Sequence, residues 1–342
     1  MDILTALDRK TDYSTTKLQF ILGAWVVSSV FERREKISSL NGDVAEDDYD
    51  KQSIYSLLYS IYKSLGEVRS ETGEPYEMTF NTWGYAWPAS WGSALTKAGD
   101  PQRHGRNAYT GLFQFEQVKE YVKARLGHVH LVEMGCGTGA GAHHICKEVL
   151  PNATYEAFDM QYAAIQTCRR KFVPELNGRL VATCDDCTLT PAKGMADIVV
   201  VCETHVTEMP GVVTKEDKLF FDNVRRMLKP GGFLLWGNAI PDSTWQPCFD
   251  YLQSIGLQKR EVRDVSREAI QARDEDEGRV NAFVEHCLDT FYAFKLPVLG
   301  AKRRNEASQA MKNFYRNPGT HLYQTMVDGT DTYKVGLFQT LH

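Results

Sequence analysis

From residue 128 to residue 240, short apolar runs alternate with stretches of helical periodicity, and no other feature constrains the fold as strongly. Each run has about the length of a strand, and the fourth is apolar almost throughout, as in strands buried on both faces. This alternation predicts an α/β fold in which a parallel sheet carries helices on both faces. The runs are HLVEMG (130–135), TYEAFDM (154–160), RLVATC (179–184), ADIVVVCE (196–203) and FLLWGN (233–238).

The rest of the chain is interpreted as additions to this core. Helical periodicity opens the sequence, and a segment rich in Gly, Pro, Trp and Tyr follows, which is typical of irregular functional segments. After the core comes a long charged helical stretch, and the end alternates around Asp328-Gly329, which is a hairpin signal. The predicted parts are a helical N-terminal extension (1–75), an aromatic covering segment with a helix (76–127), the core (128–262), a helical lid insertion (263–318) and a C-terminal β-hairpin that completes the core sheet (319–342).

Charge and composition narrow the function classes. Of 342 residues, 43% are hydrophobic, and 39 Lys and Arg against 44 Asp and Glu give a net charge of −5. This balance does not support a general attraction to nucleic acid or to an anionic membrane. The longest apolar stretch, 20–31, is shorter than the ~20 residues that span a bilayer, so no membrane span is expected.

The cysteines and the first residues indicate a compartment. The sequence does not begin with the basic-then-apolar order of a signal peptide. The eight cysteines do not follow the spacing of a disulfide framework, so we expect reduced thiols and a cytoplasmic location. Cys184 and Cys187 have no second ligand pair at suitable spacing, so no metal site is expected.

The strongest local signal is a glycine loop, Glu133-Met-Gly135-Cys-Gly137-Thr-Gly139, between an expected strand and an expected helix. Glycines allow a tight turn and the close approach of a ligand, and ligands bind at this edge of open α/β sheets. Dinucleotide enzymes use nearly the same loop, so the loop alone does not decide the ligand. Glu133 would bring negative charge near the loop, which disfavours a pyrophosphate and favours a cationic ligand.

Two further acidic positions follow in order along the chain. Asp159 ends the second expected strand and can bind ribose hydroxyls, while Asp185-Asp186 follows the third and can accept a hydrogen bond from an adenine amino group. Each of these residues could instead be a helix cap. Three acidic strand ends without a basic residue for phosphate predict a nucleoside that carries a cation.

In this order, the glycine loop, Asp159, Asp185 and the later Leu228-Lys-Pro-Gly-Gly232 resemble the motifs of class I S-adenosylmethionine-dependent methyltransferases. More loosely, residues 81–342 resemble the small-molecule group that includes the mycobacterial phthiotriolone and phenolphthiotriolone O-methyltransferase. The resemblance implies a Rossmann-like, seven-stranded and mostly parallel sheet with a C-terminal antiparallel hairpin. It also implies S-adenosyl-L-methionine as the cofactor.

The resemblance assigns cofactor contacts. Glu133 and the three glycines would contact the methionine and ribose part, and Asp159 would bind the ribose hydroxyls. Met160 would lie beside the adenine. Asp185 would face the adenine amino group, and the backbone N–H of Asp186 would face a ring nitrogen.

Methyl transfer from a sulfonium is a direct displacement, so the protein mainly aligns the reacting atoms, and a base helps when the acceptor is a hydroxyl. The end of the fourth expected strand supplies Glu203 and His205 as candidate catalytic residues. A histidine has a suitable pKa for a base near neutrality. The family places this histidine one residue further on, and His205 could also be structural, while Glu203 could orient backbone groups instead of touching substrate.

Aromatic and histidine side chains are candidates for covering the site. Tyr85 and Trp87 lie in a stretch that resembles the family's cofactor cover, where aromatic faces can attract a sulfonium, although they could equally be core residues. Arg273 and Arg279 could bind an acidic acceptor or lie on a solvated face. The candidate substrate contacts are Trp87, His143, Tyr292, Tyr315, His321 and Tyr323.

These features predict a methyltransferase that acts on a small-molecule acceptor, and a hydroxyl of a specialised metabolite is the expected target. Alternatives are S-, N- or C-methylation of a small metabolite, or a scaffold that binds S-adenosylmethionine without catalysis. A dinucleotide oxidoreductase is disfavoured by Glu133 and by the turn at 229–232. No nucleic-acid partner is expected, and the N-terminal helices could form a homodimer or cap the site.

Overall fold

The computed structural model describes residue 59 and residues 67–69, 73–188, 196–204, 209–293 and 301–341. The chain divides into two compact units. The smaller unit comprises Met1–Met78 and Asp276–Leu322, and the larger unit comprises Thr79–Glu275 and Tyr323–His342. Helix α10 (Ser266–Ala293) begins in the larger unit and continues into the smaller one.

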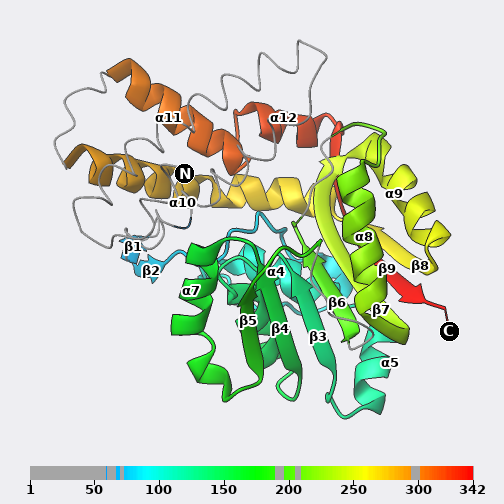
Figure 1. Cartoon of the computed structure of the whole chain (residues 1–342). Coiled ribbons are helices and arrows are strands. Elements are labelled where there is room, and N and C mark those ends of the chain that lie inside the picture. Colours follow the sequence, from blue (N-terminus) through cyan, green and yellow to red (C-terminus); the bar gives the residue numbers. More distant parts are fainter. Residues whose placement is uncertain are drawn as a thin grey trace, which may run out of the picture. The chain divides into compact units, whose positions relative to one another are not determined.

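The larger unit contains a seven-stranded sheet with the order β5-β4-β3-β6-β7-β9-β8 (Figure 1). Strands β5, β4, β3, β6 and β7 pair in parallel, and β9 pairs antiparallel with both β7 and β8. This mixed sheet confirms the predicted fold class. The strands are β3 (His130–Met134), β4 (Thr154–Asp159), β5 (Leu180–Cys184), β6 (Ala196–Cys202), β7 (Leu228–Pro241), β8 (Leu257–Asp264) and β9 (Asp331–Thr340).

Alternate side chains of the strands enter two hydrophobic clusters, one on each face of the sheet. On β3, Leu131 faces the cluster that contains residues of α4, α6 and α7, and Val132 faces the cluster that contains residues of α8 and α9. Every residue of β6 is buried, as its apolar run predicts for a strand covered on both faces. The helices are α4 (Arg103–Leu112), α5 (Glu116–Ala124), α6 (Ala140–His144), α7 (Tyr162–Lys171), α8 (Lys215–Met227) and α9 (Asp242–Ser254).

The C-terminal segment differs from the expected β-hairpin. Residues on the N-terminal side of Asp328-Gly329 form helix α12 (His321–Val327), in which Met326 is buried, and only the residues after it form a strand. Strand β9 already has β7 on one edge and β8 on the other. No edge of β9 is therefore left for a first hairpin strand to pair with, and the preceding segment becomes helical.

The smaller unit is described in part. Strands β1 (Glu67–Arg69) and β2 (Pro75–Glu77) pair antiparallel, and β1 lies where the sequence predicts only helices. Most of the expected helical extension lies outside the described residues. The unit also contains the C-terminal part of α10 and helix α11 (Ala301–Phe314), and the lid function of 263–318 stays a prediction.

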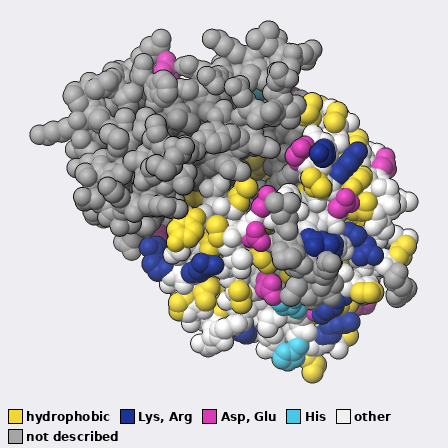
Figure 2. Space-filling view, in the orientation of Figure 1, with side chains coloured by type: hydrophobic (Ala, Val, Ile, Leu, Met, Phe, Trp, Pro, Cys, Tyr) yellow, Lys and Arg dark blue, Asp and Glu magenta, His cyan; other side chains and the backbone are white. Residues whose placement is uncertain are grey.

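Two observations bear on the expected partners. Among the described residues, no helix is long and apolar enough to cross a membrane. On the face of the molecule that Figure 2 shows, basic, acidic and hydrophobic side chains of the described part are interspersed, without a continuous basic surface.

Candidate active site

The glycine loop after β3 has a backbone that requires glycine. Gly135, Gly137 and Gly139 have φ values of 78°, 55° and 80°, which L side chains rarely adopt. A Cβ at Gly135 would lie 2.0 Å from Cγ2 of Thr204, and a Cβ at Gly139 would lie 2.2 Å from Sγ of Cys168. The first and third glycines are therefore required by neighbouring side chains of the protein itself.

Asp159, at the end of β4, holds this loop. Its Oδ2 accepts a hydrogen bond from the Gly137 N–H at 2.8 Å, and its Oδ1 accepts one from the Gln161 N–H at 2.7 Å. Burial raises the pKa of Asp159, and these two hydrogen bonds oppose the rise. The carboxylate thus connects the loop after β3 to the loop after β4, a contact that the motif does not reveal.

The third acidic position lies directly beside the second. The Asp185 N–H donates to the Asp159 carbonyl at 3.1 Å, which joins the ends of β4 and β5. The Asp186 N–H donates to Oδ1 of Asp185 at 2.9 Å, so the amide expected to face adenine forms part of a turn. Met160, expected beside the adenine, is 45% exposed.

Glu133 is fully buried on the face of β3 that points toward α4. Neither of its carboxylate oxygens accepts a hydrogen bond of ordinary geometry from the residues that the structure describes. Burial raises the pKa of Glu133 to about 7, and the nearby hydroxyls of Tyr109 and Tyr155 limit the rise. A buried carboxylate without a partner is costly unless a ligand or a proton compensates it.

Glu203, one of the two candidate catalytic residues, contacts the backbone of the aromatic segment. Its Oε2 accepts the Trp83 N–H at 2.7 Å, and its Oε1 accepts the Gly84 N–H at 2.8 Å. The Tyr333 hydroxyl also donates to Oε1, at 2.8 Å. Burial raises the pKa of Glu203, and these donors together with Arg273 oppose the rise. The other candidate, His205, lies outside the described residues.

The two aromatic candidates do not face the glycine loop in the contacts observed. Tyr85 is fully buried and makes edge-to-face contacts with Trp91 and Tyr333, with ring centroids 5.9 Å and 5.3 Å away. The Trp87 indole N–H donates to the Gly92 carbonyl at 2.9 Å. The contacts of Tyr85 are those of a core residue, which the sequence left open as an alternative.

The candidate substrate contacts are spread over both units. His143 of α6 lies 3.0 Å from Oε2 of Glu175 and packs against Phe172, and Glu175 also pairs with Lys147. Tyr323 donates to Oδ1 of Asp274 at 2.7 Å. In the smaller unit, Tyr315 is buried against Phe283 and Phe314, and His321 is exposed at the start of α12. The side chain of Tyr292 lies outside the described residues.

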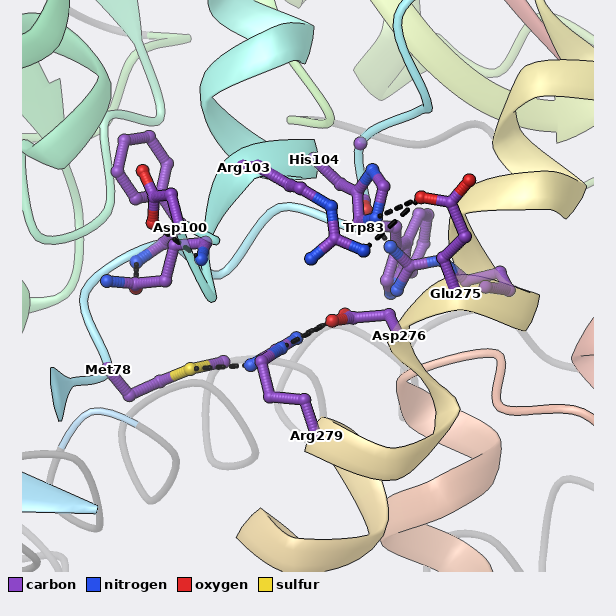
Figure 3. Close-up of polar contacts among 12 residues, drawn as sticks. Met78, Trp83, Asp100, Arg103, His104, Glu275, Asp276 and Arg279 are labelled. Carbon is purple, nitrogen blue, oxygen red and sulfur yellow. Dashed lines mark hydrogen bonds and ion pairs between the residues drawn. The ribbon is translucent and has the colours of Figure 1, made fainter. Parts of the chain in front are cut away.

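Sequence reasoning missed the polar contacts that α4 makes. His144 is buried and lies 2.8 Å from the Thr110 hydroxyl, and burial lowers its pKa to about 4. On the first turn of α4, Arg103 and His104 both approach Oε2 of Glu275, at 3.2 Å and 3.5 Å (Figure 3). These residues come from distant segments, so no local spacing could have indicated their contacts.

The two arginines considered for an acidic acceptor are buried within the protein. Arg273 donates to the Trp83 carbonyl in the larger unit. In the smaller unit, Arg279 pairs with Asp276 and approaches the Met78 sulfur (Figure 3). The alternative of a solvated charged face is therefore wrong for both residues.

The residues present fit an adenosyl ligand with a cationic amino-acid part. The buried carboxylate of Glu133 accepts no hydrogen bond of ordinary geometry from the described residues, and three glycines without side chains follow it at the end of β3. Residues 131–232 match a protein family described as a methyltransferase domain. The matched range contains Glu133, Asp159 and Asp185. With the sheet order, this match confirms the predicted class: the chain is an S-adenosylmethionine-dependent methyltransferase with a Rossmann-like fold.

Known proteins of similar sequence carry the names of methyltransferases. A probable phthiotriol/phenolphthiotriol dimycocerosates methyltransferase 2 of Mycobacterium ulcerans is 24% identical over 200 residues, which are 58% of this chain and 70% of that protein. A fatty-acid O-methyltransferase of Mycolicibacterium smegmatis is 22% identical over 229 residues, 67% of this chain and 77% of that protein.

Solved structures show the same fold at low identity. A putative sarcosine dimethylglycine methyltransferase of Galdieria sulphuraria has a TM-score of 0.53 at 9% identity and covers 84% of this chain and 98% of its own. The (4+2)-cyclase SpnF has a TM-score of 0.52 at 14% identity and covers 85% of this chain and 96% of its own. Because one of these proteins is titled a cyclase, the fold alone does not define the reaction.

Proposed function

We propose that this methyltransferase transfers its methyl group by direct displacement to a hydroxyl of a small, partly apolar metabolite. Two similar proteins are named as methyltransferases of phthiotriol dimycocerosates and of fatty acids, and the second name states O-methylation. S-adenosylmethionine supplies an already activated methyl group, so the protein contributes alignment, exclusion of water and, for a hydroxyl, removal of a proton.

The observation that carries the proposal is the gathering of acidic groups at three neighbouring strand ends. Strands β3, β4 and β5 are adjacent, and Glu133, Asp159 and Asp185 lie on or directly after them. We assign Glu133 and the glycine loop to the methionine part. Asp159 and Met160 are assigned to the ribose and the adenine, and Asp185 to the adenine amino group.

The proton acceptor is the open part of the proposal. Glu203 already accepts three hydrogen bonds, which makes it a poor candidate for the base. His205 therefore stays our candidate for a hydroxyl acceptor. Methylation of an amine or a thioether needs less help from a base, so N- or S-methylation predicts little effect of His205→Ala on turnover. C-methylation also requires removal of a proton, and binding without catalysis gives no turnover at all.

The donor site is tested by calorimetry with S-adenosylmethionine, S-adenosylhomocysteine and NAD. We expect binding of the first two, and binding of NAD alone would overturn the proposal.

Asp159→Asn should weaken donor binding at least tenfold. The asparagine amide has a single acceptor oxygen, so it cannot accept hydrogen bonds from both backbone N–H groups and from the ribose hydroxyls. The exposed Asp250 of α9 accepts a hydrogen bond from Gln246 of the same helix, so Asp250→Asn serves as the matched control.

Transfer is tested with a donor labelled in the methyl group and an extract of small metabolites. A labelled methyl ether that survives base, or a labelled methyl ester from which base releases labelled methanol, supports O-methylation. Tight donor binding without labelled product from any extract would favour the scaffold alternative. With an acceptor in hand, His205→Ala should lower turnover more at pH 6 than at pH 9 if His205 serves a phenol, and a uniform loss would contradict that role.

We further propose that the enzyme works in the cytoplasm. All eight cysteines are free, and most of them are buried, as expected in a reducing compartment. For the assembly, we propose a homodimer formed by the N-terminal residues, for which the sequence predicts helices. Sedimentation of the full chain and of a variant that lacks residues 1–58 would test it.

A further inference from the structure

We infer that Glu203 is a positioning residue that fastens residues 79–87, here called the strap, to the end of β6 beside the glycine loop. The inference rests on the proposed donor site. It gives Glu203 a role other than that of a base, and it explains why a carboxylate is buried at this strand end. Four groups of contacts carry it.

The start of the strap is fixed to the glycine loop and to Gln102, the residue before α4. The Thr138 hydroxyl, between the second and third glycines, donates to the Thr79 carbonyl at 2.6 Å. The Gln102 side-chain oxygen accepts the backbone N–H groups of Thr79 and Phe80, at 2.7 Å and 2.9 Å. The first strap residues are therefore held at the edge of the loop.

The middle of the strap is fixed to Glu203. Two consecutive N–H groups, those of Trp83 and Gly84, point at the two oxygens of one carboxylate. On the other side of this peptide, Arg273 of α10 donates to the Trp83 carbonyl. A cation and an anion therefore hold neighbouring backbone groups of the strap, and each charged hydrogen bond of this kind is stronger than a neutral one.

Gly84 has the geometry that this contact demands. Its φ is +66°, and a Cβ at this position would lie 2.0 Å from the His104 carbonyl oxygen of α4. Only glycine allows the strap to lie this close to α4 while its N–H points to Glu203. The strap is thus built to follow a single path.

Glu203 itself is rigidly connected to the donor loop. It has a φ of 51°, which is uncommon for a residue with a side chain, and its N–H donates to the Gly237 carbonyl of β7 at 2.8 Å. The next residue, Thr204, donates to the Gly135 carbonyl at 2.9 Å. A shift of Glu203 would therefore move both the strap and the first glycine.

These anchors bracket residues 80–82. One anchor is at the glycine loop and the other at the end of β6, and β3 and β6 are neighbours in the sheet. The bracketed residues consequently span the strand ends where the methionine part of the donor is assigned. Glu203 thereby sets the distance between the strap and the donor, and its loss should affect the amino-acid part of the ligand more than the adenosine.

Hydrogen exchange of the ligand-free chain tests the contact itself. In Glu203→Gln, the side-chain NH₂ group would face at least one backbone N–H, and two donors cannot form a hydrogen bond. Amide hydrogen exchange in peptides covering 79–87 should therefore be at least tenfold faster than in the wild type. Tyr333→Phe removes one donor but keeps the carboxylate, and a smaller increase is expected. Glu175→Gln, an exposed acidic position paired with Lys147 and His143, should leave the strap unchanged.

Calorimetry tests the consequence for the donor. In Glu203→Gln, S-adenosylhomocysteine should bind at least tenfold more weakly, whereas adenosine, which lacks the amino-acid part, should bind within twofold of the wild type. Equal losses for both ligands would indicate general damage and would overturn the inference. If Glu203→Gln does not fold, Tyr333→Phe is measured in its place. Its affinity for S-adenosylhomocysteine should then fall relative to the wild type, while its affinity for adenosine should not.

A pH profile separates the positioning role from that of a base. If Glu203→Gln left the strap protected and the affinity for S-adenosylhomocysteine unchanged, yet removed the acidic limb of turnover against pH, the inference would be wrong. Failure of the wild type to bind S-adenosylhomocysteine would contradict the proposed function instead. The exchange measurement would still decide whether Glu203 holds the strap.

Discussion

Two buried side chains, Glu133 and His144, have pKa shifts that change the stability of the fold in opposite directions as the pH rises. The pKa of Glu133 rises from 4.5 to about 7, so the folded chain binds a proton more tightly there than the unfolded chain does. The pKa of His144 falls from 6.5 to about 4, so the folded chain binds that proton less tightly. Between about pH 4.5 and 6.5, the two contributions to the free energy of unfolding have opposite slopes and largely cancel.

Removing the Glu133 titration should stabilise the ligand-free chain at alkaline pH. The shift from 4.5 to about 7 corresponds to about 3 kcal/mol that is present near pH 4.5 and lost as the pH rises through 7. Glu133→Gln should therefore unfold at higher urea concentration than the wild type at pH 8, with little difference near pH 4.5. The same variant should bind the donor more weakly, and a variant less stable than the wild type at pH 8 would contradict this account.

His144→Asn should flatten the acid side of the stability curve. The wild-type imidazole contributes stability that is present above pH 6.5 and lost as the pH falls toward 4, about 3 kcal/mol in all. The asparagine variant should be less stable at pH 7, because the contact with Thr110 is altered, and the gap should narrow as the pH approaches 4. Urea unfolding at a series of pH values measures this, and a constant gap would show that His144 does not titrate in the folded chain.

At the scale of elements, the order of strands and helices in the core could be predicted because each strand carries its own signal. The apolar run of β6, the glycines after β3 and the turn before the main part of β7 are all local in sequence. Helix α12 could not be predicted in this way, since its helical state follows from the occupied edges of β9. Likewise, the donors to Glu203 come from Trp83, Gly84 and Tyr333, which are 120, 119 and 130 residues away.

Two glycines with nearly the same φ can be compared, one in the loop after β3 and the other in the turn before β5. Gly135 has a φ of 78° and faces Thr204, whereas Gly178 has a φ of 80° and a Cβ there would meet nothing within 4 Å. Gly178→Ala should lower the free energy of unfolding by about 1 kcal/mol, which is the strain of the left-handed conformation alone. Gly135→Ala should cost more, by about 1–3 kcal/mol, and should weaken donor binding, because Thr204 must also move. Urea unfolding and calorimetry check both, and equal costs would refute the contact.

At the scale of the whole molecule, the smaller unit contains a buried pair of opposite charges. Arg279 and Asp276 are 8% and 3% exposed, and the pair also contacts Tyr76 and Met78. Burial opposes the charge on Arg279, yet hydrogen bonding and attraction to Asp276 raise its pKa above the ordinary value. The stability of this unit therefore depends on keeping both charges or on removing both.

Asp276→Asn should destabilise the smaller unit by about 3–5 kcal/mol, because it leaves the Arg279 charge buried without its anion. The double variant Asp276→Leu/Arg279→Met should recover most of this loss. Hydrogen exchange read separately for the two units locates the effect. Faster exchange of the core strands with unchanged exchange in α10 and α11 would contradict the prediction.

The position of β9 has a consequence for biosynthesis. This strand follows every other described strand in the sequence, yet it lies between β7 and β8. During translation, β7 and β8 leave the ribosome long before the strand that separates them, and their unpaired edges can meanwhile pair with other chains. The sheet can be completed only after residue 340 has emerged, so the edges of β7 and β8 stay open to wrong pairing until translation has passed that point.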